Sequence, residues 1–258
     1  NDNTTGASNA ALGYNALAAN TTGAYNIAVG ASSLAANTTA SYNTVIGYNA
    51  STASTTAQRN TAVGYTALAA ATTGSDNAVV GAYAGSGITT GLENTFLGYY
   101  AGNATTDANY NTGVGSGALQ LNTTGTYNVA VGARALDAST TTSNNTAIGY
   151  SALGATTSGT ANVAVGVSAL IANTTADYNT AVGSNAMAAN TTGTYNIAVG
   201  SLALDANTTT SSNVAVGHQA LTANTASNNT AVGKGAMVEN TTGDTNTAVG
   251  YLVLDANT

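Results

Sequence analysis

The segment Asn190–Thr210, "NTTGTYNIAVGSLALDANTTT", decides the fold, because close variants of it fill most of the 258-residue chain. The chain contains 15 copies, each opened by an asparagine, from Asn9 to Asn246. Successive copies are 17 residues apart, except for one step of 16 residues before Asn229. A fixed period of this length is typical of repeat architectures, in which each repeat stacks on its neighbours. We number the positions of each repeat from its opening asparagine.

The repeat reads N-[TIV]-A-V-G-x-x-A-L-x-A-N-T-T-G-x-Y, and two of its positions are large and apolar. Position 4 is Val, Ile or Leu in every copy, and position 9 is Leu or Met except at Ser51, Gly85 and Gly102. Because positions restricted to large aliphatic residues are usually buried, we predict that both columns form the core. Representative core residues are Val29, Val63, Val131, Val182, Leu34, Leu68, Leu136 and Leu204.

The local pattern favours strands over helices. Asn, Thr, Gly and β-branched residues are poor helix formers, whereas positions 2 to 4 alternate between two faces as a short strand does. We predict a second extended piece at "ALxA" and a turn at "NTTGxY". Two strands and two turns in each repeat indicate an all-β fold, a β-solenoid (parallel β-roll) with 17-residue rungs. Stacked rungs should form an asparagine ladder (Asn26, Asn60, Asn128, Asn179) and a column of turn glycines (Gly30, Gly64, Gly132, Gly183).

The thin rung suggests self-association. A core of one Val and one Leu for each rung is small against the entropy lost on folding. In this interpretation the alanines of positions 3 and 8, such as Ala28 and Ala67, form a second, flat face. Packing that face against copies of itself would add buried apolar area and remove sheet edges. We therefore favour a homotrimer, with residues 1–258 as a single repeat domain and an uncapped segment of a longer fibre.

Composition argues against several function classes. Only 5% of the residues are charged, the net charge is -7, and Arg59, Arg134 and Lys234 are the only basic side chains, which argues against nucleic acid. No apolar run is long enough to insert in a membrane. The chain has no cysteine and one histidine, His218, which we interpret as a surface residue. We expect no enzymatic activity, no metal and no cofactor.

Charged side chains recur at two positions of the repeat. Position 17 holds Arg59, Asp76 and Glu93 in consecutive repeats, which predicts a surface ion stripe or simply an interruption of the tyrosines found there. The carboxylates of position 10 lie in distant repeats, so we interpret them as solvating charges rather than an acid/base pair. They are Asp137, Asp205 and Asp255.

Tyrosines mark two features of the sequence. Position 17 is often Tyr, as at Tyr25 and Tyr42, and either stacking along one edge or a sugar-binding platform explains this column. Two irregular repeats lose the leucine of position 9 at Gly85 and Gly102 and contain additional tyrosines. They predict a local bend or a receptor patch. The candidate patch consists of Tyr83, Tyr99 and Tyr100.

The segments "NTAVGYTAL" (Asn60–Leu68) and "NTTGTYNIAVG" (Asn190–Gly200) resemble two related groups of repeats. The first is the head domain of trimeric autotransporter adhesins, and the second is the repeat region of phage-type tail-fibre and bacterial surface fibre proteins. The resemblance covers essentially the whole chain from Asn9 onward. It implies a left-handed β-roll in an elongated homotrimeric fibre, extracellular on a cell or virion surface, that displays or contacts a glycan or another cell-surface receptor.

A second class of function fits the repeated "NTT" of the turns. Regular ladders of Thr and Asn are what an ice-binding solenoid uses, so ice binding is the alternative to a structural or adhesive fibre.

Overall fold

The computed structural model of the chain describes residues 3–256. It contains two compact units, residues 1–127 and 128–258. Both units are parallel β-solenoids in which every rung contributes one strand of three residues. The predicted all-β solenoid is therefore confirmed, whereas its left-handed sense and the single domain over residues 1–258 stay predictions.

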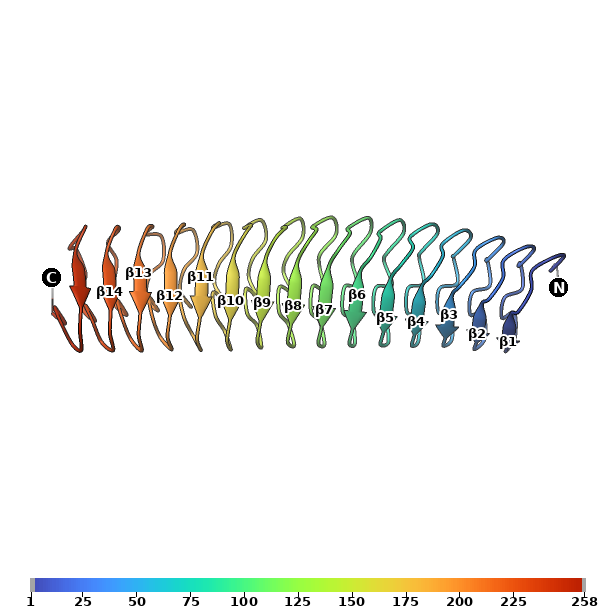
Figure 1. The fold of residues 1–258 in the computed structure, drawn as a ribbon, viewed down its shortest axis with the longest axis horizontal. Coiled ribbons are helices and arrows are strands. Elements are labelled where there is room, and N and C mark those ends of the chain that lie inside the picture. The colour runs from blue at the N-terminus through green and yellow to red at the C-terminus, as the bar shows by residue number, and fades with distance from the viewer. Residues whose placement is uncertain (1–2, 257–258) are drawn as a thin grey trace. The chain divides into compact units, whose positions relative to one another are not determined.

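Unit 1 stacks its strands in chain order (Figure 1). Neighbouring strands pair in parallel with a shift of one whole repeat, so that Ala28 lies beside Val45 and Phe96 beside Gly113. Each position of the repeat therefore meets the same position of the next rung. The strands are β1 (Ala10–Leu12), β2 (Ile27–Val29), β3 (Thr44–Ile46), β4 (Thr61–Val63), β5 (Ala78–Val80), β6 (Thr95–Leu97) and β7 (Thr112–Val114).

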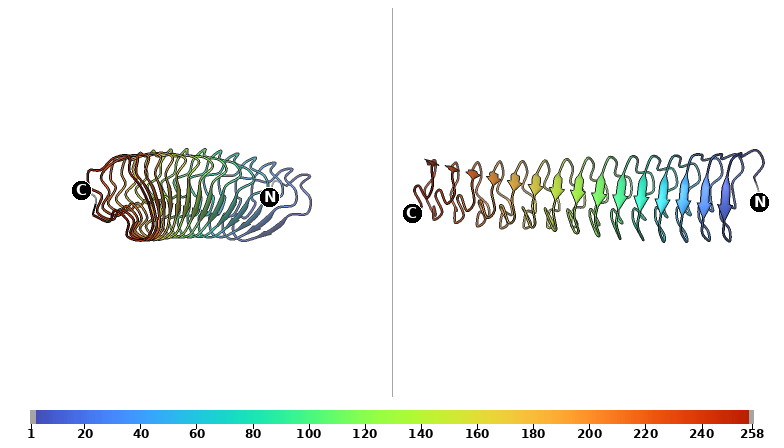
Figure 2. Two further views of the ribbon diagram at one scale, coloured as in Figure 1. Left: turned by 60° about the vertical axis from the view of Figure 1, so that its left-hand side comes forward. Right: turned by 60° about the horizontal axis from the view of Figure 1, so that its bottom comes forward.

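Unit 2 repeats the arrangement, and Figure 2 shows its successive rungs following the same path. The one short repeat does not shift the register, because Val214 still pairs with Thr230. The missing residue comes from the segment 224–228, which lies outside the strands. The strands are β8 (Val129–Val131), β9 (Thr146–Ile148), β10 (Val163–Val165), β11 (Thr180–Val182), β12 (Ile197–Val199), β13 (Val214–Val216), β14 (Thr230–Val232) and β15 (Thr247–Val249).

The strand turns its alanine inward and its large aliphatic residues outward. Ala28 and Ala62 are fully buried, so the predicted exposed alanine face is wrong. Prediction of position 4 as core is also wrong, because these side chains share the outer face with position 2. Val29, Val63 and Val131 are partly exposed and Val182 is exposed.

Position 9 belongs to the core as predicted, since Leu34, Leu68, Leu136 and Leu204 are all fully buried. It does not lie in a second strand, however. Leu68 has a φ of 53°, in the left-handed region that strand residues do not adopt. Its N–H still donates to the carbonyl oxygen of Ala84 in the next rung at 3.0 Å. The wall opposite the strands is thus a hydrogen-bonded stack of turns rather than a sheet.

The inner strand residue and the position-9 residue share one small space. Wherever position 3 is larger than Ala, position 9 is smaller than Leu. A Cβ added at Gly85 would lie 3.2 Å from a methyl carbon of Val79, which shows that the two positions face each other across the rung. Only about one large side chain fits, so the core accepts alanine with leucine and leaves the outer valines outside. The exchanged pairs are Val45 with Ser51, Val79 with Gly85, and Phe96 with Gly102.

These exchanges also correct the predicted bend. The strands β5, β6 and β7 keep the regular register through the irregular repeats, with Val79 beside Phe96 and Phe96 beside Gly113. Gly85 and Gly102 therefore make room for the larger inner residues Val79 and Phe96 and do not interrupt the stack of rungs.

The asparagine ladder is confirmed, and it bonds mainly to the backbone. Asn60 is representative: its N–H donates to Oδ1 of Asn43 at 2.9 Å, and its Nδ2 donates to the carbonyl oxygen of Gly74 at 2.8 Å. Each amide thus ties its rung to the previous one and also closes the turn 14 residues later. The predicted ladder residues Asn26, Asn60, Asn128 and Asn179 are all buried.

A second set of asparagine contacts, not predicted as such, links those neighbouring rungs that carry asparagine at position 12. Asn37 donates from Nδ2 to Oδ1 of Asn20 at 2.8 Å and to the carbonyl oxygen of Ala40 at 3.2 Å. The "NTT" of the turn is therefore selected for a buried amide that bonds both along the stack and within its own turn.

The glycine of position 5 is required by its conformation and by its neighbours. Gly64 has a φ of 141°, and a Cβ there would lie 2.5 Å from the carbonyl oxygen of Gly81. The other predicted turn glycines, Gly30, Gly132 and Gly183, have φ values of 125°, 135° and 139°.

Position 7 gives a prediction about strain, because it also has positive φ. Asn15, Asn49 and Asn185 occupy it in three rungs, whereas Thr66 occupies it with a φ of 55°. A β-branched residue is strained in this region, and asparagine tolerates it better. We expect Thr66→Asn to raise the free energy of unfolding by about 0.5–1 kcal/mol, measured by urea denaturation. Thr66→Val is the control and should show no gain; an equal gain from both substitutions would contradict the explanation.

Candidate recognition surfaces

The outer strand face is the first candidate surface. We define it as the side chains of positions 2 and 4 on each strand, which alternate outward from the buried position 3. Position 2 is mostly Thr, Val or Ile, and position 4 is Val, Ile or Leu in every rung. Ile27, Leu97, Ile148 and Ile197 are all exposed on this face. Within each unit the face is therefore a continuous stripe of β-branched and aliphatic side chains.

The packing inside a rung does not explain why position 4 is always Val, Ile or Leu. A partly exposed strand position tolerates Thr, Ser or Lys without loss of the interior, yet no copy carries a polar residue there. Large exposed apolar patches on soluble proteins usually mark contact surfaces. The packing inside the rung therefore does not account for the aliphatic column of position 4, and the outer strand face is a candidate contact surface.

The second surface is a group of five tyrosines on consecutive rungs of unit 1, here called the tyrosine cluster. Tyr83 stacks on Tyr100, with ring centroids 4.9 Å apart, and meets Tyr65 edge to face at 5.2 Å. Tyr99 meets Tyr100 edge to face at 4.4 Å. Tyr48 extends the row by stacking on Tyr65 at 5.5 Å.

The structure brings together the predicted patch residues Tyr83, Tyr99 and Tyr100, and it adds Tyr48 and Tyr65. The sequence held a signal for the two missed residues: Tyr48, Tyr65 and Tyr99 all occupy position 6 of their repeats. Their neighbours in the cluster occupy position 7, one residue further on. Stacking like positions on like positions would have predicted the pairs Tyr48–Tyr65 and Tyr83–Tyr100, but not the contact between Tyr65 and Tyr83 that joins them.

The cluster combines apolar rings with accessible hydroxyl groups. Tyr48, Tyr65 and Tyr99 are each about half exposed. A hydrogen bond with Tyr65 raises the pKa of Tyr83 above its ordinary value, and desolvation raises the pKa of Tyr100. Both shifts favour the neutral phenols of Tyr83 and Tyr100, and the cluster itself contains no acidic or basic residue.

The tyrosines of position 17 form separate stacks, as one of the two interpretations of that column expected. Tyr25 and Tyr42 lie 5.2 Å apart with nearly parallel rings, and Tyr178 and Tyr195 do the same at 5.2 Å. These pairs are shorter than the tyrosine cluster, and each contains only two rings in the described contacts.

Charged residues form one ion pair among the described residues 3–256. Arg59 binds both carboxylate oxygens of Asp76, at 2.6 and 2.8 Å, and this contact lowers the pKa of Asp76. The predicted stripe is thus present for these two residues, and no contact of Glu93 with them is seen. His218 is exposed, as predicted for a surface residue.

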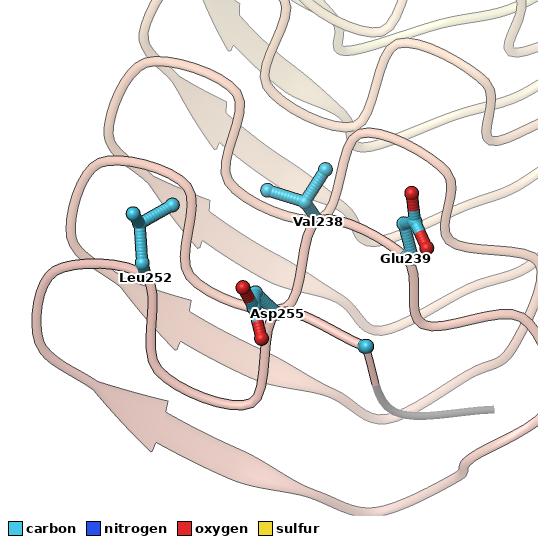
Figure 3. A pocket seen from close by; sticks show the side chains of 5 residues that line it. Val238, Glu239, Leu252 and Asp255 are labelled. Atoms are coloured by element: carbon cyan, nitrogen blue, oxygen red, sulfur yellow. The ribbon is translucent and has the colours of Figure 1, made fainter.

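Partial desolvation raises the pKa of two of the position-10 carboxylates, Asp137 and Asp205. Asp255 lines a pocket of about 220 Å³ together with Val238, Glu239, Leu252 and Ala256 (Figure 3). These residues come from two successive rungs. The pocket lining holds two acidic residues and no histidine or basic residue.

Within residues 3–256 no group of three or more His, Cys, Asp or Glu side chains is placed to hold a metal ion. The same part of the chain has no helix that could span a membrane. The chain matches no protein-family model, and no curated protein matches it in sequence.

Proposed function

We propose that this chain is a segment of a structural or adhesive fibre on the surface of a cell or virion, assembled as a homotrimer through the outer strand face. The observation that carries the proposal is the unbroken aliphatic column at position 4, which remains partly or fully exposed on every strand of a single chain. Three copies that meet along this stripe would bury it without any change inside the rung.

The resemblance to trimeric adhesin heads and tail fibres supports the same assignment. The interface proposed for the trimer is the outer strand face and not the alanine face that the sequence suggested, because those alanines are already buried within each rung. Low charge and long ladders of backbone and amide hydrogen bonds suit a passive extracellular scaffold. We assign it no enzymatic activity and no cofactor.

The mass of the particle in solution tests this proposal. Light scattering should give three times the chain mass of 24.9 kDa. Val80→Lys with Val199→Lys places one charge on the outer strand face of each unit, at side chains that are 37% exposed in the single chain. We expect this variant to be monomeric and to keep the far-UV spectrum of a β-protein, since neither residue contributes to the inner core.

Ser116→Lys with Ser184→Lys is the matched control, because it also adds one lysine to each unit and Lys234 occupies the same position 6 in another rung. It adds charge away from the outer strand face and should leave the trimer intact. If the unmodified chain is a folded monomer at micromolar concentration, the trimer proposal is wrong. If the control variant dissociates as well, the outer strand face is not the trimer interface.

Ice binding is the second candidate, on a different set of residues from the one the sequence suggested. The turn threonines are engaged within the stack, since Thr21 Oγ1 donates to the carbonyl oxygen of Thr38 at 2.9 Å and Thr191 Oγ1 to that of Thr208 at 3.0 Å. The outer strand face instead presents exposed threonines such as Thr61. An ice-binding protein should lower the freezing point of water while it is a monomer of 24.9 kDa. A fibre segment should not lower the freezing point.

A further inference from the structure

The tyrosine cluster is not needed to build a rung. Position 6, which carries Tyr48, Tyr65 and Tyr99 in the cluster, holds Ser184 and Ser201 in rungs of the same fold. An aromatic ring that leaves about half its surface in water contributes less burial than a core residue does. Stability of the rung therefore does not explain why these side chains are aromatic.

Position 7 makes the same point more strongly. Tyr83 and Tyr100 have φ values of 58° and 57°, in the left-handed region. Asn49 and Asn185 fill this position elsewhere at φ values of 52° and 54°, and asparagine is the better residue there. The backbone at this position therefore does not require an aromatic residue, and Tyr83 and Tyr100 must be explained by the contacts of their side chains.

The rings also form one surface rather than isolated contacts. The contacts run without interruption from Tyr48 through Tyr65 and Tyr83 to Tyr100 and Tyr99. Rungs are spaced by about 4.8 Å, so the row extends over four rungs along the stack. Both flat stacking and edge-to-face contacts occur, and the row therefore exposes ring surface and phenol hydroxyls side by side.

The chemistry of this surface selects its partner. It contains no acidic or basic residue, so neither a polyanion nor a basic peptide gains an ionic contact with the cluster. Sugar rings combine an apolar C–H face with hydroxyl groups at their edge, which matches aromatic rings bordered by hydroxyls. We propose that the tyrosine cluster binds a neutral carbohydrate chain lying along the stack, with the half-exposed rings of Tyr65 and Tyr99 as its main contacts. This names the partner class of the surface fibre proposed above and rests on that function only for its biological setting.

The test starts with the trimer or whatever particle the full chain forms. An array of neutral oligosaccharides of glucose, galactose and mannose is probed first, and the strongest ligand is then titrated by calorimetry and by tyrosine fluorescence. The chain has 14 Tyr and no Trp, so a change in emission reports on tyrosine alone. We expect Tyr65→Ser with Tyr99→Ser to weaken binding by about tenfold or more, as loss of aromatic anchors does elsewhere.

Tyr83→Asn with Tyr100→Asn is the second variant, and it should weaken binding while the fold is kept or strengthened. The control removes two rings from the other column, Tyr178→Ser with Tyr195→Ser, and should bind like the unmodified chain. The proposal is overturned if no neutral oligosaccharide binds, or if the control weakens binding as much as the cluster variants do.

Failure of the carbohydrate proposal remains distinguishable from failure of the fibre proposal. The cluster variants should keep the particle mass of the unmodified chain, because their side chains do not lie on the outer strand face. Val80→Lys with Val199→Lys should lower the mass of the particle, while the tyrosine cluster of each chain still binds the oligosaccharide.

Discussion

Gly102→Leu is expected to lower the free energy of unfolding by about 3 kcal/mol or more, although leucine is the usual residue of position 9. A Cβ at Gly102 would lie 2.5 Å from Cζ of Phe96, so even alanine collides with the ring. Phe96 is fully buried, and its ring also lies close to Gly113 of the next rung, where an added Cβ would be 2.9 Å from Cδ1. The substitution toward the consensus should therefore destabilise this rung, in contrast to the usual benefit of consensus residues.

Phe96→Ala should be destabilising on its own, by about 3–5 kcal/mol, because it leaves a cavity beside two glycines. The double substitution Phe96→Ala with Gly102→Leu recreates the alanine and leucine pair of most rungs and should recover most of the loss. Urea denaturation of the two single variants and the double variant gives the coupling energy. Additive losses in the double variant would show that the two positions do not share one space.

The exchange of Phe96 with Gly102 also shows what could and could not be predicted from the sequence. Period, strand position, turn glycines and the asparagine ladder follow from Asn and Gly at fixed spacing, because stacking imposes the same geometry on every copy. The assignment of faces failed, since it assumed that the larger residue of "AVG" points inward. Only the exchange of Val79 with Gly85 and of Phe96 with Gly102 reveals that the interior has room for one large side chain.

The candidate surfaces were predictable to different degrees. Tyr83, Tyr99 and Tyr100 could be predicted because their two repeats lose the leucine of position 9 for glycine, whereas Tyr48 and Tyr65 occupy a position that several other repeats also fill with tyrosine. The outer strand face was misread for a physical reason: an invariant aliphatic column looks the same in a sequence whether it is buried inside a rung or reserved for contact outside it. Only side-chain exposure separates the two cases.

Substitution of a ladder asparagine is expected to give the second large loss of stability. Asn162 is fully buried, and its Nδ2 donates to the carbonyl oxygen of Ala176 at 2.8 Å while its Oδ1 accepts from the N–H of Asn179 at 2.9 Å. Asn162→Ala leaves the buried N–H of Asn179 without an acceptor, while the carbonyl oxygen of Ala176 keeps only the longer bond from Nδ2 of Asn173 at 3.2 Å. An unsatisfied buried N–H costs about 1–3 kcal/mol and the lost bond to Ala176 adds about 1 kcal/mol, so we expect a loss of about 2–4 kcal/mol, measured by urea denaturation at pH 7.

Asn162→Asp tests whether the donated hydrogen bond, and not only the shape of the amide, holds the ladder. The introduced carboxylate keeps the acceptor for Asn179 but faces the carbonyl oxygen of Ala176 with no proton to donate. Burial and this repulsion should raise its folded-state pKa well above the ordinary value of about 3.9. The protonated form can donate, so stability should be greatest below the unfolded-state pKa and should fall as the pH rises through the folded-state pKa.

The variant should therefore be strongly destabilised at pH 7 and regain much of its stability near pH 4, relative to the unmodified chain at each pH. Asn144→Asp is the matched control, because Asn144 is exposed and Asp76 occupies the same position 17 naturally. It should change stability little at either pH. If Asn162→Asp were equally stable at pH 4 and pH 7, the donated bond to Ala176 would not be what holds the rung, and the ladder would act through the acceptor oxygen alone.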